Sequence, residues 1–356
     1  MKNLKNSGRR LEKEELEDLV VGCTLLGCGG GGSPENGRRW IDRVLRKGRE
    51  VILIGMDDLP ANTFTVSPYF VGPVEGSPRR NIAALAVVGL EEFLGREFEA
   101  VVPTELGGNS TAVAIATAAE LGIPVVDGDM AGRAVPELHQ SVYYLHGYGM
   151  APFSVVTPEE DLLIVPRIGD DRRAEILVRA IVSAVGKVGV ASHPFDATVS
   201  KRVLLKGTLS WAIALGRALR GEDWESELME LGGVLLFRGV CVSLKRNEEG
   251  GFTKGIIQLE GTGEFEGEMY EIVFKNENLI GLRNGAVNAT VPDLITMLTS
   301  EGIPVGNSNV RPGGEYVVFG FSAPEIWRSR RGLELLGPRA FGFDVEYVPI
   351  ERRVLR

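Results

Sequence analysis

The sequence predicts an α/β N-terminal domain with a mostly parallel or mixed sheet, followed by a β-rich C-terminal domain. Three observations support this fold class. Up to about residue 165, apolar strand candidates alternate with helical segments, which is the pattern of βαβ units. From about residue 232, short strand candidates are separated by turns that contain glycine. The length of 356 residues favours two domains, at about 150 residues for each.

The N-terminal domain is expected to span residues 1–165, and it opens with a helix over residues 12–26. This segment has acidic residues at its start, where they suit the helix dipole, and apolar residues at helical spacing. Gly27 and Gly29 to Gly32 follow, and Ser33-Pro34 is typical of the first residues of a second helix, which we expect to reach about residue 48. The pattern then predicts these elements: strands at 51–56 and 63–70, a helix at 81–94, a strand at 100–103, a helix at 110–121 and a strand at 123–126.

Residues 166–356 are expected to form a helical connector that leads into the β-rich domain. Helices are predicted at 170–186 and 197–219, with a strand near 187–191 between them, and one further short helix at 292–300. Turn signals such as Asn247 to Gly251 and Arg311 to Gly314 divide the rest of this half into strands.

Composition excludes several classes of function. The net charge is −9, so a general nucleic-acid-binding surface is not expected. No apolar stretch has the length of a membrane span and no signal peptide is visible, so we expect a cytoplasmic protein. Three cysteines without a Cys-x-x-Cys pattern suggest free thiols, and three scattered histidines argue against a histidine-rich zinc site. The unusual number is 46 glycines in 356 residues, about 13% against a norm of about 7%.

The first candidate site is the glycine loop, which we define as Gly27 to Gly32. It matches Gly-x-Gly-x-x-Gly, but a dinucleotide-binding loop follows a strand, whereas a helix is predicted here. A P-loop is excluded because Ser33 stands where its lysine would be. The loop can bring bare backbone and its N–H groups close to a ligand. Cys28 is either a nucleophile with a pKa lowered by these amides or an inert cysteine in a tight turn.

The second candidate site consists of two loops that follow consecutive strands. Glu105 to Asn109 follows one strand, and Asp127 to Glu137 follows the next. In open α/β sheets, ligands bind at the carboxyl ends of strands, so Glu105, Asp127 and Asp129 are expected to converge for acid–base chemistry or for binding a divalent metal. Alternatively, these acids cap helices or pair with Arg133. His139 is a weaker candidate near the same place.

The C-terminal half offers fewer signals. Its polar candidates are Glu277-Asn278, Asn288, Asp293 and Arg311, together with the run Gly337 to Asp344. In that run Arg339 stands among glycine and apolar residues. It is either part of a buried turn or directed into a cleft between the domains, where ligand sites are common.

Taken in order, these motifs resemble the S-methyl thiohydantoin desulfurase family, whose members are often named beside hydantoinase and oxoprolinase proteins. The resemblance covers residues 12–350 and rests on the following segments: Leu26 to Gly32, Glu105 to Asn109, Pro124 to Ala134, Pro136-Glu137, Pro292 to Ile295 and Gly337 to Gly342. It implies the same two domains. It also implies that water replaces methylthiolate on an S-methylated thiohydantoin, which yields hydantoin and methanethiol.

On this reading, the catalytic candidates are Cys28, Glu105, Asp127 and Asp129. The substrate-binding candidates are Gly29, Gly30, Gly31, Gly107, Gly108, Asn109, Arg133, Glu137 and Arg339. One route has the Cys28 thiolate attack the ring carbon before a carboxylate activates water; the other has a carboxylate, or a metal held by Glu105, Asp127 and Asp129, activate water directly. The sequence requires no cofactor.

The expected partners are a small-molecule substrate and a second copy of the chain in a homo-oligomer, with a hydantoinase-type protein as a further possibility. Two other functions remain open from the sequence. One is a non-catalytic ligand-binding or accessory subunit of a hydantoinase-type complex. The other is a nicotinamide-dependent oxidoreductase, which requires Val20 to Leu26 to be a strand and Asp57 or Asp58 to bind the ribose.

Overall fold

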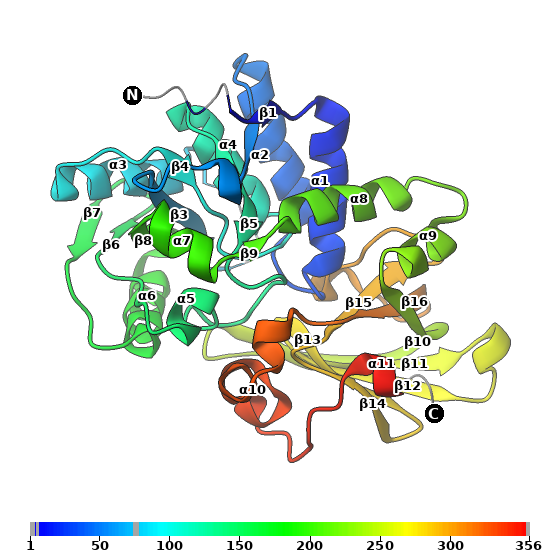
Figure 1. The fold of residues 1–356 in the computed structure, drawn as a ribbon. Coiled ribbons are helices and arrows are strands. Elements are labelled where there is room, and N and C mark those ends of the chain that lie inside the picture. Colours follow the sequence, from blue (N-terminus) through cyan, green and yellow to red (C-terminus); the bar gives the residue numbers. More distant parts are fainter. Residues whose placement is uncertain (1–3, 5–6, 74–77, 354–356) are drawn as a thin grey trace.

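The computed structural model describes residues 4, 7–73 and 78–353. It contains two sheets, and Figure 1 shows the N-terminal one above the C-terminal one. The predicted fold class is confirmed: the N-terminal sheet is mixed and has helices on both faces, and the C-terminal sheet is antiparallel.

The N-terminal sheet has a parallel centre and antiparallel flanks. Its strand order is β1 (Arg9–Arg10), β2 (Ile52–Gly55), β5 (Val125–Asp129), β4 (Ala100–Val101), β3 (Phe64–Val71), β8 (Val188–Asp196), β6 (Phe153–Val156) and β7 (Leu162–Val165). Strands β2, β5, β4 and β3 run parallel, and the short β9 (Leu205–Lys206) pairs with β5. Because β8 lies beyond residue 165, the chain returns to this sheet before it enters the second one.

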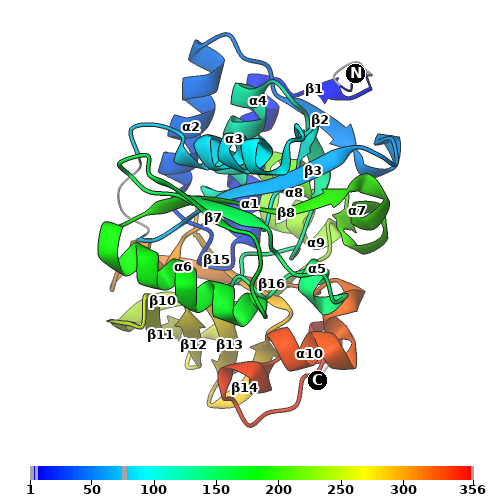
Figure 2. The ribbon, with the colours of Figure 1, turned by 90° about the vertical axis from the view of Figure 1, so that its left-hand side faces the viewer.

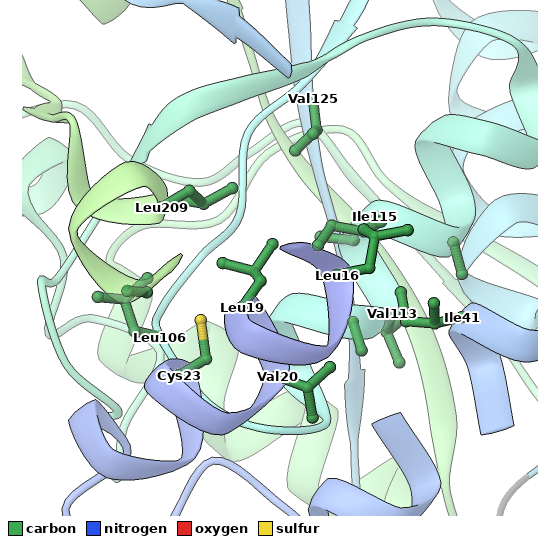
Figure 3. Close-up of a cluster of buried hydrophobic side chains, with 14 of the residues drawn as sticks. Leu16, Leu19, Val20, Cys23, Ile41, Leu106, Val113, Ile115, Val125 and Leu209 are labelled. Carbon is green, nitrogen blue, oxygen red and sulfur yellow. The ribbon is translucent and has the colours of Figure 1, made fainter. Parts of the chain in front are cut away.

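Helices cover both faces of this sheet. One face packs against α1 (Lys13–Leu26), α2 (Pro34–Arg46), α3 (Ile82–Leu94), α4 (Ser110–Leu121) and α8 (Thr208–Ala218). The other face packs against α5 (Val142–Leu145), α6 (Asp171–Val185) and α7 (Ala197–Val203). Figure 3 shows the centre of the first layer, where Leu19 and Cys23 of α1 lie close to Leu209 of α8 and Leu106.

Helices α1 and α8 cross at unusually short range because glycine stands at the contact on each helix. A Cβ atom at Gly22 would lie 1.8 Å from the carbonyl oxygen of Ala212, and one at Gly216 would lie 1.9 Å from that of Asp18. The crossing anchors the end of α1 from which the glycine loop departs.

The C-terminal sheet follows α9 (Trp224–Glu230). Its order is β14 (Ala286–Thr290), β13 (Glu277–Arg283), β12 (Met269–Lys275), β11 (Phe252–Gly261), β10 (Gly233–Glu249), β16 (Glu315–Phe321) and β15 (Leu294–Thr299). The remaining helices are α10 (Arg330–Leu336), α11 (Ile350–Arg353) and the 3-10 turns η2 (Met56–Asp58), η3 (Gly263–Phe265), η4 (Asn307–Asn309), η5 (Glu325–Arg328) and η6 (Pro338–Phe341).

Two predicted elements are corrected. The helix predicted at 292–300 is absent, and Leu294–Thr299 form strand β15 instead, because pairing with β16 outweighs the local helical pattern. The expected helix at 197–219 is divided into α7, β9 and α8. By contrast, Val20 to Leu26 lies within α1, as predicted, so the strand that the nicotinamide hypothesis requires does not form. No helix in the described part of the chain has the length and apolar character needed to cross a bilayer.

Candidate functional site

The glycine loop joins α1 to α2 in a backbone conformation that few residues adopt. Cys28, Gly29, Gly31 and Gly32 all have positive φ, between 50° and 86°. The following helix begins as predicted, since the Ser33 hydroxyl accepts a hydrogen bond from the Asn36 amide and Pro34 occupies the first turn. Consecutive positive φ values explain why this loop is made of glycine, and they make Cys28 an exception.

At the loop glycines, polar side chains of the protein occupy the space that a Cβ atom would take. A Cβ atom at Gly29 would lie 2.4 Å from Nδ2 of Asn307, one at Gly30 would lie 2.0 Å from Oε1 of Glu277, and one at Gly32 would lie 2.8 Å from Cβ of Asn109. The positions that Cβ atoms would occupy at these glycines are therefore taken by side chains of the protein. The C-terminal domain fills most of this space from β13 and η4, and Asn109 fills the rest.

Two of the glycines after strand β4 allow the loops of the N-terminal domain to touch. A Cβ atom at Gly107 would lie 2.4 Å from the Cα atom of Gly31, and one at Gly108 would lie 2.4 Å from Oγ1 of Thr24. The Asn109 amide donates to the Gly31 carbonyl over 3.0 Å. The structure thus brings Gly31 and Gly32 of the glycine loop against Gly107 and Asn109.

Arg133 binds the two domains together from the centre of the site. Its side chain is buried, and its guanidinium donates to the carbonyl groups of Asn278, Pro292 and Asp293 at 3.1–3.2 Å. The Asn278 amide in turn donates to the Cys28 carbonyl over 2.7 Å. The glycine loop is therefore held between loops of the first domain and strand β13 of the second.

We call the place where the glycine loop meets strand β13 of the second domain the junction. Glu105 and Glu277 are two buried carboxyl groups at this junction. The Val135 amide donates to Glu105 over 2.9 Å, and the Gly31 backbone weakly opposes the rise in the pKa of Glu277. Burial raises the pKa of Glu105 to about 7. Burial and the negative charge of Glu105 raise the pKa of Glu277 to about 8, against the opposing effect of Arg133. At neutral pH the pair is therefore expected to hold a proton.

Several acceptor oxygens beside the glycine loop have no hydrogen-bond partner within the described structure. They belong to Asn109, Glu277, Asn278 and Asn307, one side-chain oxygen each. Buried acceptors without partners are costly, and they are usually satisfied by water or by a ligand. Their clustering identifies the junction as a polar site that can accept hydrogen bonds from a small molecule.

Cys28 lies buried inside the glycine loop. The thiol is fully buried and directs its hydrogen to the Leu26 carbonyl over 3.3 Å. Burial raises the pKa of this thiol, although Arg133 opposes the shift. Of the two alternatives for Cys28, the buried cysteine in a tight turn fits this environment, because the loss of water around the sulfur outweighs nearby positive charge.

Asp127 and Asp129 each accept hydrogen bonds from backbone amides, at two different places in the N-terminal domain. Asp127 accepts from the amides of Leu209 and Ser210 at the start of α8. Asp129 is buried, and burial raises its pKa to about 6. Its Oδ2 accepts hydrogen bonds from the Ala131 and Gly132 amides, and these bonds shape the turn before Arg133. Asp129 is near enough to Glu105 for its negative charge to raise the pKa of Glu105, whereas Asp127 is turned toward α8. The described residues contain no group of three or more potential ligands placed to hold a metal ion.

Glu137 and Arg339 lie near an adjoining groove of about 690 Å³ on the C-terminal sheet. Glu137 pairs with Lys275, and its second oxygen is 3.5 Å from Nδ1 of the buried His139. Arg339 is 64% exposed and pairs with Glu346, so it is not directed into the junction. Its neighbours Ala340 and Phe341 line the groove together with Lys245, Arg246, Lys254, Lys275, Ile256, Val273, Leu279 and Phe343.

Sequence reasoning missed two of the residues at the junction. Glu277 was noted among the polar residues of the C-terminal half but was not assigned to the site, and Asn307 was not noted. The available signal was the polar run Asn276 to Asn278, which interrupts two apolar strand segments. Only the packing of the two domains shows that this run faces the glycine loop.

The fold and the site together define a class of two-domain protein in which an α/β domain and an antiparallel β domain hold a glycine loop and two buried carboxyl groups between them. The chain belongs to the S-Me-THD-like family. The N-terminal domain of that family matches residues 14–167, and its C-terminal domain matches residues 169–350.

A crystal structure of a protein from Chromobacterium violaceum has the same fold, with a TM-score of 0.82 and 24% sequence identity. The match covers 96% of this chain and 100% of the other. A search of curated proteins found no significant match.

Proposed function

We propose that this protein is a hydrolytic desulfurase that acts on a small five-membered ring of the S-methyl thiohydantoin type and releases methanethiol and a hydantoin. Membership of the S-Me-THD-like family supports this class of substrate. The observation that carries the proposal is the pair Glu105 and Glu277, with pKa values raised to about 7 and about 8 beside the glycine loop. When two neighbouring carboxyl groups titrate near neutral pH, one can act as the base and the other as the acid in one reaction.

In the proposed reaction, Glu105 in its ionised form takes a proton from water while the water oxygen bonds to the ring carbon that carries sulfur. Glu277 in its protonated form donates its proton to the ring nitrogen as charge develops there. Collapse of the adduct then breaks the carbon–sulfur bond, and the methylthiolate takes the proton that Glu105 now holds and leaves as methanethiol. The hydroxyl group of the adduct gives its proton to the ionised Glu277, which restores both carboxyl groups to their starting states. The ring retains the oxygen as a carbonyl, so the reaction consumes one water and needs no redox partner.

A covalent route through Cys28 is the alternative. It requires the thiolate to attack the ring carbon and expel methanethiol before water hydrolyses the adduct. The buried thiol with its raised pKa favours the direct route, because little thiolate exists near neutral pH. Cys28→Ala separates the two routes: the direct route predicts turnover within about tenfold of the wild type, and the covalent route predicts complete loss.

The basic groove beside the site supports a preference among ring substituents. Lys275 is the cross-strand partner of Glu277, so the two side chains lie on the same face of the sheet. A substituent that extends from the ring past Glu277 would therefore enter the groove, where Lys245, Arg246 and Lys254 favour negative charge. We expect an acidic substituent on the ring to lower KM relative to a neutral one of the same size.

The test is release of methanethiol from S-methyl thiohydantoins, followed with a thiol reagent, with the hydantoin identified by mass spectrometry in ¹⁸O-labelled water. We expect one labelled oxygen per product and a rate maximum between pH 7 and pH 8. Glu105→Gln and Glu277→Gln should each lower kcat at least 100-fold, whereas the exposed Glu266→Gln should not. Tight binding of the ring without thiol release would contradict the proposal and favour a ligand-binding subunit.

A further inference from the structure

Strand β7 leaves one edge of the N-terminal sheet open. It is the last strand in the order, and among the described residues it pairs with β6 alone; Figure 2 shows it on the side that faces the viewer. All four of its residues are apolar, and Leu162 and Leu163 are 45% and 38% exposed. Proteins usually protect such edges with charge, proline or a covering segment, because free N–H and C=O groups on an apolar strand recruit another strand.

The apolar surface continues on both faces of this edge. Leu162 packs toward Gly89 of α3, and the exposed side chains Val88 and Phe93 lie on the same helix. Val165 packs on the opposite face with Ile181 and Val182 of α6. A strand added beside β7 would therefore bury apolar side chains above and below the sheet as well as pairing the backbone.

The charges at the two ends of β7 are complementary to each other. Glu159, Glu160 and Asp161 precede the strand, and Arg167 follows it after Pro166. Glu160 pairs with Arg80, and the Asp161 carboxylate accepts from Thr157. Glu159 and Arg167 are exposed and make no ion pair or hydrogen bond with another described residue. In an antiparallel pair of β7 strands that centres on Leu163, Glu159 of each copy would lie opposite Arg167 of the other.

We propose that two copies of this chain form a symmetric dimer by antiparallel pairing of their β7 strands, which joins the N-terminal sheets into one continuous sheet. The interface is isologous, so each favourable contact occurs twice. Both charge contacts lie at its rim, where they set register and orientation, and the apolar residues of β7, α3 and α6 are covered between them.

The test is the oligomeric state in solution, measured by analytical ultracentrifugation over a range of protein concentrations. The wild type should be a dimer at micromolar concentration. Leu163→Lys should make it monomeric, whereas Met269→Lys on β12 of the C-terminal sheet, at 41% exposure, should leave the dimer intact. Circular dichroism identifies any variant that fails to fold.

Charge reversal gives the sharper result. Arg167→Glu and Glu159→Lys should each weaken the dimer about 100-fold, at about tenfold for each symmetric contact. The double variant should restore affinity to within about tenfold of the wild type. An equal mixture of the two single variants should form mixed dimers, since both contacts are then of opposite charge. A monomeric wild type, a dimer unaffected by Leu163→Lys, or a double variant no tighter than the single ones would each overturn the proposal.

Discussion

Replacing Glu277 by glutamine should stabilise the protein at neutral pH while it abolishes turnover. Burial and Glu105 raise the pKa of Glu277 from 4.5 to about 8. Between these two values the unfolded chain is ionised while the folded one keeps its proton, so unfolding releases a proton and stability falls as the pH rises. One pKa unit corresponds to about 1.4 kcal/mol, so the penalty grows from near zero at pH 4.5 to about 3 kcal/mol at pH 7.

Glutamine keeps the shape of the protonated carboxyl and does not titrate. Glu277→Gln should therefore match the wild type near pH 4.5 and exceed it by up to about 3 kcal/mol at pH 7. The assay is urea unfolding followed by tryptophan fluorescence at pH 5, 6, 7 and 8, with the exposed Glu266→Gln as the control. A Glu277→Gln variant that is less stable than the wild type at pH 7, or whose advantage does not grow with pH, would refute this reasoning.

Three further predictions concern residues that support the site. Gly216→Ala should destabilise the protein by about 2–3 kcal/mol in urea unfolding, because the added methyl group would meet the Asp18 carbonyl on α1. Gly169→Ala is the control: no described atom lies within 4 Å of a Cβ atom there, so stability should change by less than about 0.5 kcal/mol. Arg133→Met should lower the free energy of unfolding by about 3–5 kcal/mol, because it leaves three carbonyl groups of the C-terminal domain without their donor. The variant should also be cut more readily at the domain junction in limited proteolysis. An unchanged unfolding midpoint would contradict this role of Arg133. Asp127→Ala should lower stability by about 1 kcal/mol through loss of the α8 cap, while methanethiol release stays near the wild-type rate. If its kcat falls as far as that of Glu105→Gln, Asp127 is a catalytic residue after all.

Local patterns determined the elements that lie next to the site. The acidic start and apolar spacing of residues 12–26 predicted α1, and Ser33-Pro34 predicted the start of α2, since both signals act within one or two turns of the chain. The loops after the parallel strands were also identified as functional candidates from their place in the sheet. Strand β15 was mistaken for a helix because its pairing with β16 is a contact between distant residues, which a local pattern does not encode.

The sequence by itself determined that glycine, acids and an arginine are concentrated in a few loops between predicted elements. Only the tertiary structure decided what each of them does. It turned Asp127 toward α8, gave the Arg133 guanidinium three carbonyl partners across the domain junction, and buried Cys28 so that its pKa rises. It also placed Glu277 of the second domain against Gly30 of the first, across 247 positions of sequence. The physical reason is that pKa values and hydrogen-bond partners depend on burial and on neighbours in space, which arise only when the two domains pack together.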